Sequence, residues 1–248
     1  LARGKEDLRA PRLLAARRER LNAGPMDWTA LRLSLALAAW TLAILLPLGI
    51  VAGRWLASTR SRSRPWLEAL TALPLVLPPT VVGFYLLVAL GAQSPLGDAF
   101  ARVFGAPLAF SFAGLVVASV IVNIPFAVQP LQRAFAAIPH EVREAAQCCG
   151  LSRWQAFLRI ELPLAWPGVL SAAVLTFAHT LGEFGVVLMV GGSIPGETKT
   201  IAIAIYDRVQ AFDTSAAGTM ALVLLVVSFV TVALSFVLSD RWLRSDRR

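Results

Sequence analysis

Charged residues are scarce in this chain. Asp, Glu, Lys and Arg make up 15% of its 248 residues, whereas a soluble domain usually carries about 25%. Apolar residues make up 57%, and the mean hydropathy is +0.68. So small a charged fraction argues against an ordinary soluble domain and indicates a membrane protein.

Cysteine and histidine are also rare, at two residues each. Cys148 and Cys149 are adjacent, and on the cytoplasmic side predicted below such a pair does not form a structural disulfide. A metal site needs further ligands at suitable spacing, which His140 and His179 do not supply. We therefore predict no metal site and interpret the cysteines as small core residues.

Most of the chain consists of long uncharged, mainly apolar stretches. Five runs, each bounded by charged residues, are long enough to cross a ~30 Å hydrocarbon core as helices. Lipid cannot satisfy loose backbone amides, and the runs lack the alternation of barrel strands. We predict an all-α membrane protein in which Pro78-Pro79 kinks or unwinds the second span. The predicted spans are approximately 30–53, 66–91, 110–132, 163–190 and 215–239.

The distribution of Lys and Arg predicts the orientation. Twelve arginines lie in the loops 54–64 and 133–159 and in the tail after Asp240, against four basic residues on the other side (Arg32, Arg102, Lys199, Arg208). The loop 139–162 and the C-terminus are therefore expected in the cytoplasm, with the N-terminus outside.

Residues 1–25 conflict with that orientation. They carry seven basic residues on the predicted outer side and have no apolar core of the kind found in signal peptides. We interpret them as a disordered extension or a start-site artefact, with Met26 as the native first residue. Much of the net charge of +8 lies here, so we predict no nucleic-acid partner. Membrane lipid is the expected surrounding.

The loop 139–162 has the pattern of a helical elbow. Small residues on one face of a short helix over 140–147 allow close helix approach, and Gly150 permits a sharp turn. A second helix is expected over 151–160, with apolar residues three and four apart. Pro163 suits the start of the next spanning helix.

Polar residues inside the spans are candidates for the pathway or a gate. Glu183 is the one acid deep within an apolar stretch, where an ionisable residue is a functional candidate by default. A structural or gating role is favoured over substrate contact, because a carboxylate repels an anion. Further candidates are Pro78, Pro79, Thr80 and Asn123. His179, one turn before Glu183, is interpreted as a packing residue.

Two segments after the fourth span complete the pattern. The stretch 191–200 lacks a Lys directly after its second Gly, so it is not a phosphate-binding loop. Residues 201–212 have apolar side chains about four apart, which predicts an amphipathic helix on the outer side. A membrane-embedded enzyme using Glu183, His179 and the cysteines is the alternative of a different class, and their opposite sides of the membrane argue against it.

The string Glu144-Ala145-Ala146, three residues, Gly150, nine residues and Ile160-x-Leu162-Pro163 resembles the signature of ABC importer permeases. The resemblance implies a type-I importer permease with a cytoplasmic coupling helix. The ATPase-coupling residues carried over are Glu144, Ala145, Ala146, Gly150, Ile160, Leu162 and Pro163. The family commonly has Arg-Thr-Leu before the Gly, where this chain has Gln147-Cys148-Cys149, so the details of the ATPase contact are not carried over at these positions.

Three further strings resemble the molybdate permease family. They are residues 73–83 (LPLVLPPTVVG), 181–185 (LGEFG) and 194–201 (IPGETKTI). Sulfate permeases share part of this pattern but are usually longer, and neither sulfate nor tungstate is separated from molybdate by these strings. The outer loop with Gly196, Glu197, Thr198 and Lys199 is expected to meet a binding protein.

The resemblance implies a non-catalytic permease subunit in the inner membrane of a bacterium. Its expected partners are a second copy of itself, two cytoplasmic ABC ATPase subunits and an extracytoplasmic molybdate-binding protein. No cofactor is expected in this chain, because ATP is used by the partner subunits. The sequence has no fixed cationic cage within the spans, so selectivity is expected in the binding protein.

Overall fold

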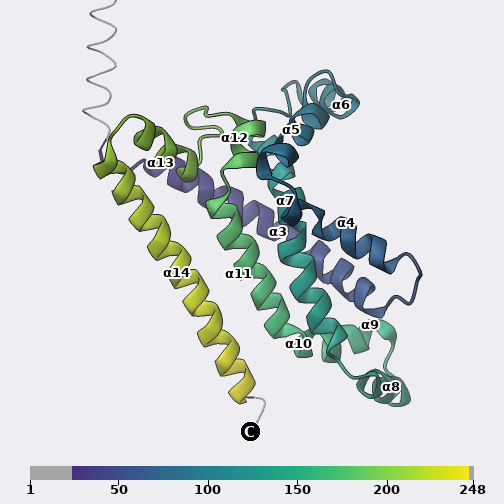
Figure 1. The fold of residues 1–248 in the computed structure, drawn as a ribbon. Helices are drawn as coiled ribbons and strands as arrows, with labels where there is room; N and C mark the ends of the chain where they lie inside the picture. Colours follow the sequence, from purple (N-terminus) through teal and green to yellow (C-terminus); the bar gives the residue numbers. More distant parts are fainter. Residues whose placement is uncertain (1–23, 246–248) are drawn as a thin grey trace, which may run out of the picture.

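The computed structural model describes residues 24–245, and within this range every regular element is a helix (Figure 1). Three helices are long and apolar enough to cross a membrane: α3 (Trp28–Ser58), α7 (Phe112–Ala136) and α14 (Thr214–Ser245). Two bent helix pairs bring the number to five if each pair is one span. The predicted all-α membrane fold is confirmed, whereas residues 1–23 of the predicted extension lie outside the described part.

The core is formed where α3, α7 and α11 (Trp166–Gly182) pack against one another. Leu131 and Phe135 of α7 are fully buried in it. The α3–α7 crossing is close, because a Cβ atom built on Gly53 would lie 2.8 Å from the Leu131 Cβ and 2.9 Å from the Gln132 backbone nitrogen. Small residues permit such backbone approach between membrane helices.

The second predicted span is two helices rather than one kinked helix. α4 (Arg64–Val76) and α5 (Pro79–Leu90) meet at an angle of 107°. Leu77, between them, is extended with φ −75° and ψ 141°. The residue before a proline is pushed toward this conformation, and proline cannot continue the hydrogen-bond ladder. Pro78-Pro79 therefore breaks the span completely.

The fourth predicted span, 163–190, is also interrupted. α11 ends at Gly182, and the short α12 (Gly185–Gly191) begins after Glu183 and Phe184. At its other end, α11 follows the segment Arg153–Leu164 at a bend of 68°. The fifth span is continuous, since α14 runs through the whole of the predicted range 215–239.

Short helices gather at the two ends of the bundle (Figure 1). At one end lie α8 (His140–Cys148) and α9 (Arg153–Ala156). At the other end lie α6 (Pro95–Phe104), α12 and α13 (Ile201–Gln210). The predicted amphipathic helix over 201–212 ends two residues early: Phe212 is 91% exposed at φ +59°, outside α13.

Candidate functional site

The first arm of the elbow (residues 139–162) is α8. Ala146 is buried on its inner face, whereas Glu144 and Ala145 are exposed. The Glu144 carboxylate lies 3.1 Å from Nδ1 of His140, one turn earlier on the same exposed face. Cys148 and Cys149 are exposed rather than core residues, which corrects the expectation above.

The turn after α8 depends on Gly150. Its φ is +74°, in the left-handed region, and a Cβ placed there would meet nothing within 4 Å. Glycine is therefore favoured here by the backbone conformation and not by lack of space. The turn is closed by the Leu151 N–H, which donates to the Ala146 carbonyl at 3.2 Å.

The second arm begins with a capping box. The Ser152 side chain accepts from the Gln155 N–H, and the Gln155 side chain accepts from the Ser152 N–H. After one turn of α9, residues Phe157–Glu161 form a π-helix, followed by α10 (Leu162–Leu164). The predicted single helix over 151–160 therefore begins only at Arg153, as one α turn, and continues as a π-helix from Phe157. Single π turns are rare in proteins, and those that occur are often found at functional sites.

Glu161 is the buried anchor of the elbow. Its residue is only 6% exposed. Oε2 accepts from Nε of Arg54 at 2.6 Å, and Oε1 accepts from Nη2 of the same guanidinium at 3.1 Å. Such a two-pronged arginine–carboxylate pair is among the stronger polar contacts in proteins. The Arg54 guanidinium also lies 4.9 Å from the centre of the Phe157 ring.

Arg143 connects the same anchor to α8 and to the end of α7. Its Nε lies 4.0 Å from Oε1 of Glu161, and its Nη2 donates to the Phe135 carbonyl at 2.7 Å. One carboxylate thus joins the end of α3, the first arm and the second arm. The cluster therefore connects the elbow to α3 and α7.

Sequence reasoning missed this cluster. Glu161 occupies the variable position of the Ile-x-Leu-Pro string and was used only as the charge that bounds a span, and Arg54 only as a topology marker. The available signal was an acid directly before an apolar span, which needs a cationic partner if buried. The predicted coupling residues Ile160, Leu162 and Pro163 flank Glu161 and are half-buried.

A second cluster is a buried polar chain through the middle of the bundle. The Thr41 hydroxyl donates to Ser119 Oγ at 2.9 Å, and Asn123 Nδ2 donates to the Ser119 carbonyl at 2.8 Å. Asn123 Oδ1 lies 3.0 Å from Nδ1 of His179. The other His179 nitrogen lies 3.7 Å from Oε2 of Glu183. The chain links α3, α7 and α11.

Glu183 carries this chain into α12. Its Oε1 accepts from the Val186 N–H at 2.9 Å, so the side chain caps the first turn of α12. His179 is stacked on Phe126, with ring centroids 4.0 Å apart. His179 is therefore held by a ring and two polar partners, and the polar chain positions the α11–α12 break.

The two helix breaks meet at a hollow of about 260 Å³. His179 and Glu183 line it from the α11 side, and Pro79 lines it from the α4–α5 break. Of the other predicted gate residues, Pro78 and Thr80 are exposed, and Asn123 is fully buried behind His179. The fold thus brings Pro79 and Glu183 together.

The outer loop has an internal support. Thr198 is fully buried, and its hydroxyl donates to the Gly191 carbonyl at 2.6 Å while accepting from the Ile194 N–H at 3.1 Å. Lys199 Nζ pairs with Asp207 of α13 at 2.7 Å. Thr198 and Lys199 therefore hold the loop in shape.

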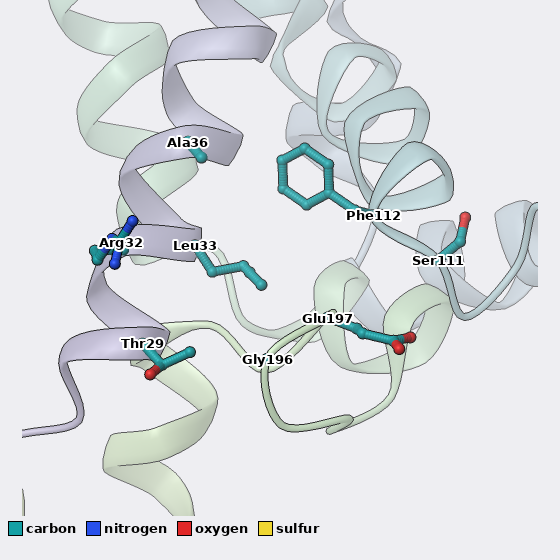
Figure 2. Close-up of a pocket in the computed structure, with 8 residues that line it drawn as sticks. All are labelled: Thr29, Arg32, Leu33, Ala36, Ser111, Phe112, Gly196 and Glu197. Carbon is teal, nitrogen blue, oxygen red and sulfur yellow. The ribbon is translucent and has the colours of Figure 1, made fainter.

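Gly196 and Glu197 belong to the exposed part of the same loop, residues 193–197. They line a hollow of about 670 Å³ together with the first turns of α3 and α7. Figure 2 shows Leu33, Phe112 and Glu197 around this hollow, each from a different element. Arg32 and Ser111, which sequence reasoning did not select, also line it.

The described residues hold no group of three His, Cys, Asp or Glu side chains placed to bind a metal ion. The exposed cysteines end α8, at the elbow end of the bundle. Glu183 follows α11 at its α12 end (Figure 1). These groups lie far apart along the bundle and form no common reaction centre.

Comparison with known proteins shows one family. Residues 46–244 match the model of the binding-protein-dependent transport system inner membrane component. The chain is 48% identical over 206 residues to the molybdenum transport system permease protein ModB of Azotobacter vinelandii, covering 83% of this chain and 91% of that protein. It is 35% identical over 217 residues to ModB of Escherichia coli K12, covering 88% and 93%.

The fold is also found among solved structures. A bacterial ABC transporter involved in the import of the acidic polysaccharide alginate matches with a TM-score of 0.70 at 20% identity. The match covers 86% of this chain and 78% of that chain. At this identity the likeness concerns the fold, and it confirms the predicted importer permease architecture.

Proposed function

The chain belongs to the family of binding-protein-dependent transport system inner membrane components, and from this we propose that it is the permease subunit of an ABC importer for molybdate. The assignment of molybdate as the substrate is supported by the 48% identity to a molybdenum transport permease over 91% of that protein's length. The family consists of transport permeases, which are not catalytic in the usual sense. Sulfate and tungstate are less favoured substrates.

The partners follow from the family. A binding-protein-dependent system needs a binding protein that delivers the substrate, and the related alginate transporter is solved in complex with its periplasmic protein. We infer that this chain also works with a cytoplasmic ABC ATPase. The finer proposal is a homodimer of this chain with two ATPase subunits, which use ATP, while the chain itself holds no cofactor.

The elbow is the proposed contact with the ATPase. Glu144 and Ala145 are exposed on α8, so a partner protein can contact them directly. Ile160, Leu162 and Pro163 surround the buried Glu161, whose pair with Arg54 leads into α3. A push on α8 would therefore move both the end of α3 and the start of α11 together.

The charge distribution supports the proposed orientation. The elbow end of the bundle carries arginines from both the 54–64 and the 133–159 loops, as the positive-inside rule expects of a cytoplasmic face. The elbow and the C-terminus are thus proposed to be cytoplasmic and the N-terminus outside. Gly196 and Glu197 then face the binding protein.

Oxyanion-competition uptake tests the function. Labelled molybdate is offered to cells lacking their own molybdate importer, with this chain and its partner subunits restored. We expect tungstate to block the uptake of labelled molybdate, and we expect a large excess of sulfate to leave it unchanged. If sulfate abolished the uptake, the protein would be assigned to the sulfate permeases. If an assembled complex took up no molybdate, the proposed function would be contradicted.

Gly150→Leu tests the elbow. The substitution meets no neighbour, so its cost is the strained left-handed backbone, about 1–2 kcal/mol. We expect ATP hydrolysis to continue while molybdate uptake falls, because the turn between the two arms is distorted. Gly150→Asn, a residue that tolerates this conformation, is the matched control and should keep most uptake. If Gly150→Leu took up molybdate as well as Gly150→Asn does, Gly150 would have no role in coupling ATP hydrolysis to transport.

Glu183 distinguishes a gate from a substrate ligand. Glu183→Gln retains an oxygen for the Val186 N–H, whereas Glu183→Ala leaves that N–H without its partner, a loss of about 1–3 kcal/mol. We expect Gln to keep most uptake and Ala to lower the maximal rate at an unchanged half-saturating molybdate concentration. A changed half-saturating concentration in Glu183→Gln would instead indicate substrate contact.

A further inference from the structure

A hollow of about 720 Å³ lies beside the elbow, between the α3–α4 connection and α8. We name it the basic hollow. Its polar wall contains Arg60, Arg64, Arg143 and His140, and its floor contains Ala57, Ala136, Ala137 and Ile138. A smaller hollow of about 220 Å³ shares Ser58, Arg143 and Gln147 with it and adds Arg54, Arg153 and the acid Glu161. The two adjoining hollows are together lined by five arginines and two acids, Glu144 and Glu161.

The positive charge of the basic hollow is only partly balanced within the chain. Glu144 is the one acid in its wall, where its carboxylate lies beside His140, and Arg143 has Glu161 at 4.0 Å from behind the wall. Arg64 pairs with Glu68 at 2.8 Å, where both side chains are more than a third exposed. Arg60 is exposed and has no ion pair within residues 24–245. Among the arginines that line the basic hollow, Arg60 is thus left with an unbalanced positive charge within the described residues.

The depth of the basic hollow matches the lipid headgroups. It lies where α3 and α7 end and α4 begins, at the end of the membrane-crossing part of the chain. Trp55 and Trp66, on either side of the α3–α4 connection, are 52% and 80% exposed. Tryptophan is enriched at the membrane–water interface. The apolar floor and the polar wall fit a group with one apolar and one anionic end.

We propose that the basic hollow binds the phosphate headgroup of an anionic phospholipid. Basic pockets between membrane helices on the cytoplasmic side take such headgroups, and each nearby Lys or Arg adds to the attraction. Arginine suits phosphate because its planar guanidinium donates two parallel hydrogen bonds. The bound lipid bridges the α3–α4 connection and α8, and so stabilises the elbow. The proposal does not depend on which oxyanion is transported.

Lipid titration of the assembled transporter tests the proposal. The complex is purified in a neutral detergent and titrated with phosphatidylglycerol or with phosphatidylcholine of identical chains, and adducts are counted by native mass spectrometry. We expect retained phosphatidylglycerol and little phosphatidylcholine. Arg60→Gln combined with Arg64→Gln should weaken phosphatidylglycerol binding about 30-fold. Arg60→Gln alone should weaken it about 5-fold, and it leaves the Arg64–Glu68 pair intact.

Arg62→Gln is the matched control, because Arg62 is exposed in the same connection but does not line the basic hollow. It removes the same charge and should bind phosphatidylglycerol like the unaltered complex. Equal weakening by Arg62→Gln and Arg60→Gln would overturn the site. So would equal binding of the two lipids, or displacement of phosphatidylglycerol by inorganic phosphate at matched ionic strength, which would show a site for free anions instead.

Discussion

Replacing Glu161 by alanine is expected to destabilise the protein by about 3 kcal/mol and to abolish coupled transport. The substitution leaves the Arg54 guanidinium without its carboxylate and removes the anion nearest to Arg143. Breaking a buried ion pair by removing one partner leaves an uncompensated charge, which costs about 3–5 kcal/mol of stability. The expected value lies at the lower end of this range because the Arg54 side chain is 36% exposed. Thermal unfolding of the complex in detergent measures the first effect.

The transport effect has its own measurement. With the anchor lost, the two arms of the elbow no longer move with α3, so ATP hydrolysis should continue without molybdate uptake. Asp98→Ala is the control, because the Asp98–Arg102 pair is exposed, at 49% and 77% of the side chains, and should contribute less than about 1 kcal/mol. An effect of Glu161→Ala no larger than that of Asp98→Ala would refute the anchor.

Gly53→Val is expected to prevent correct assembly of α3 on α7. A new Cβ would lie 2.8 Å from the Leu131 Cβ and 2.9 Å from the Gln132 backbone nitrogen. The obstacle is partly backbone, which cannot move aside as a flexible side chain does, so the overpacking cost should reach about 3 kcal/mol or more. The yield of folded protein after solubilisation, measured by size-exclusion chromatography, is expected to fall severely.

Gly218→Val is the matched control for this effect. Gly218 lies on the exposed side of α14, and a Cβ there meets nothing within 4 Å. The same valine in a helix should therefore leave the yield nearly unchanged. A normal yield of Gly53→Val would mean that the two helices have room to separate, contrary to the close crossing described here.

Local patterns predicted the elbow well. The first arm over 140–147 corresponds to α8, and the turn lies at Gly150, whose left-handed backbone glycine adopts at no steric cost. The second arm was predicted less well, because a π turn over Phe157–Glu161 interrupts the regular α pattern. The cause is tertiary: this turn directs Glu161 toward Arg54, far away in the chain.

Of the two helix breaks, one was predicted in place but not in degree, and the other was not predicted. Pro78-Pro79 indicated a kink, and the structure has a 107° bend between two separate helices. The break at Glu183 and Phe184 was not predicted, since no proline marks it and the flanking Gly182 and Gly185 also occur within membrane helices. Glu183 forms the cap that makes this break stable, by accepting from the Val186 N–H.

By itself the sequence determined what depends on composition and on short stretches of chain: the membrane environment, the helical spans, the turn at Gly150 and the family strings. The tertiary structure decided which distant groups meet. Arg54 and Glu161, Asn123 and His179, and Pro79 and Glu183 are separated by long stretches of chain, yet each pair shares a contact or a hollow. Such pairs follow from helix crossings set by close packing, and no local pattern encodes them.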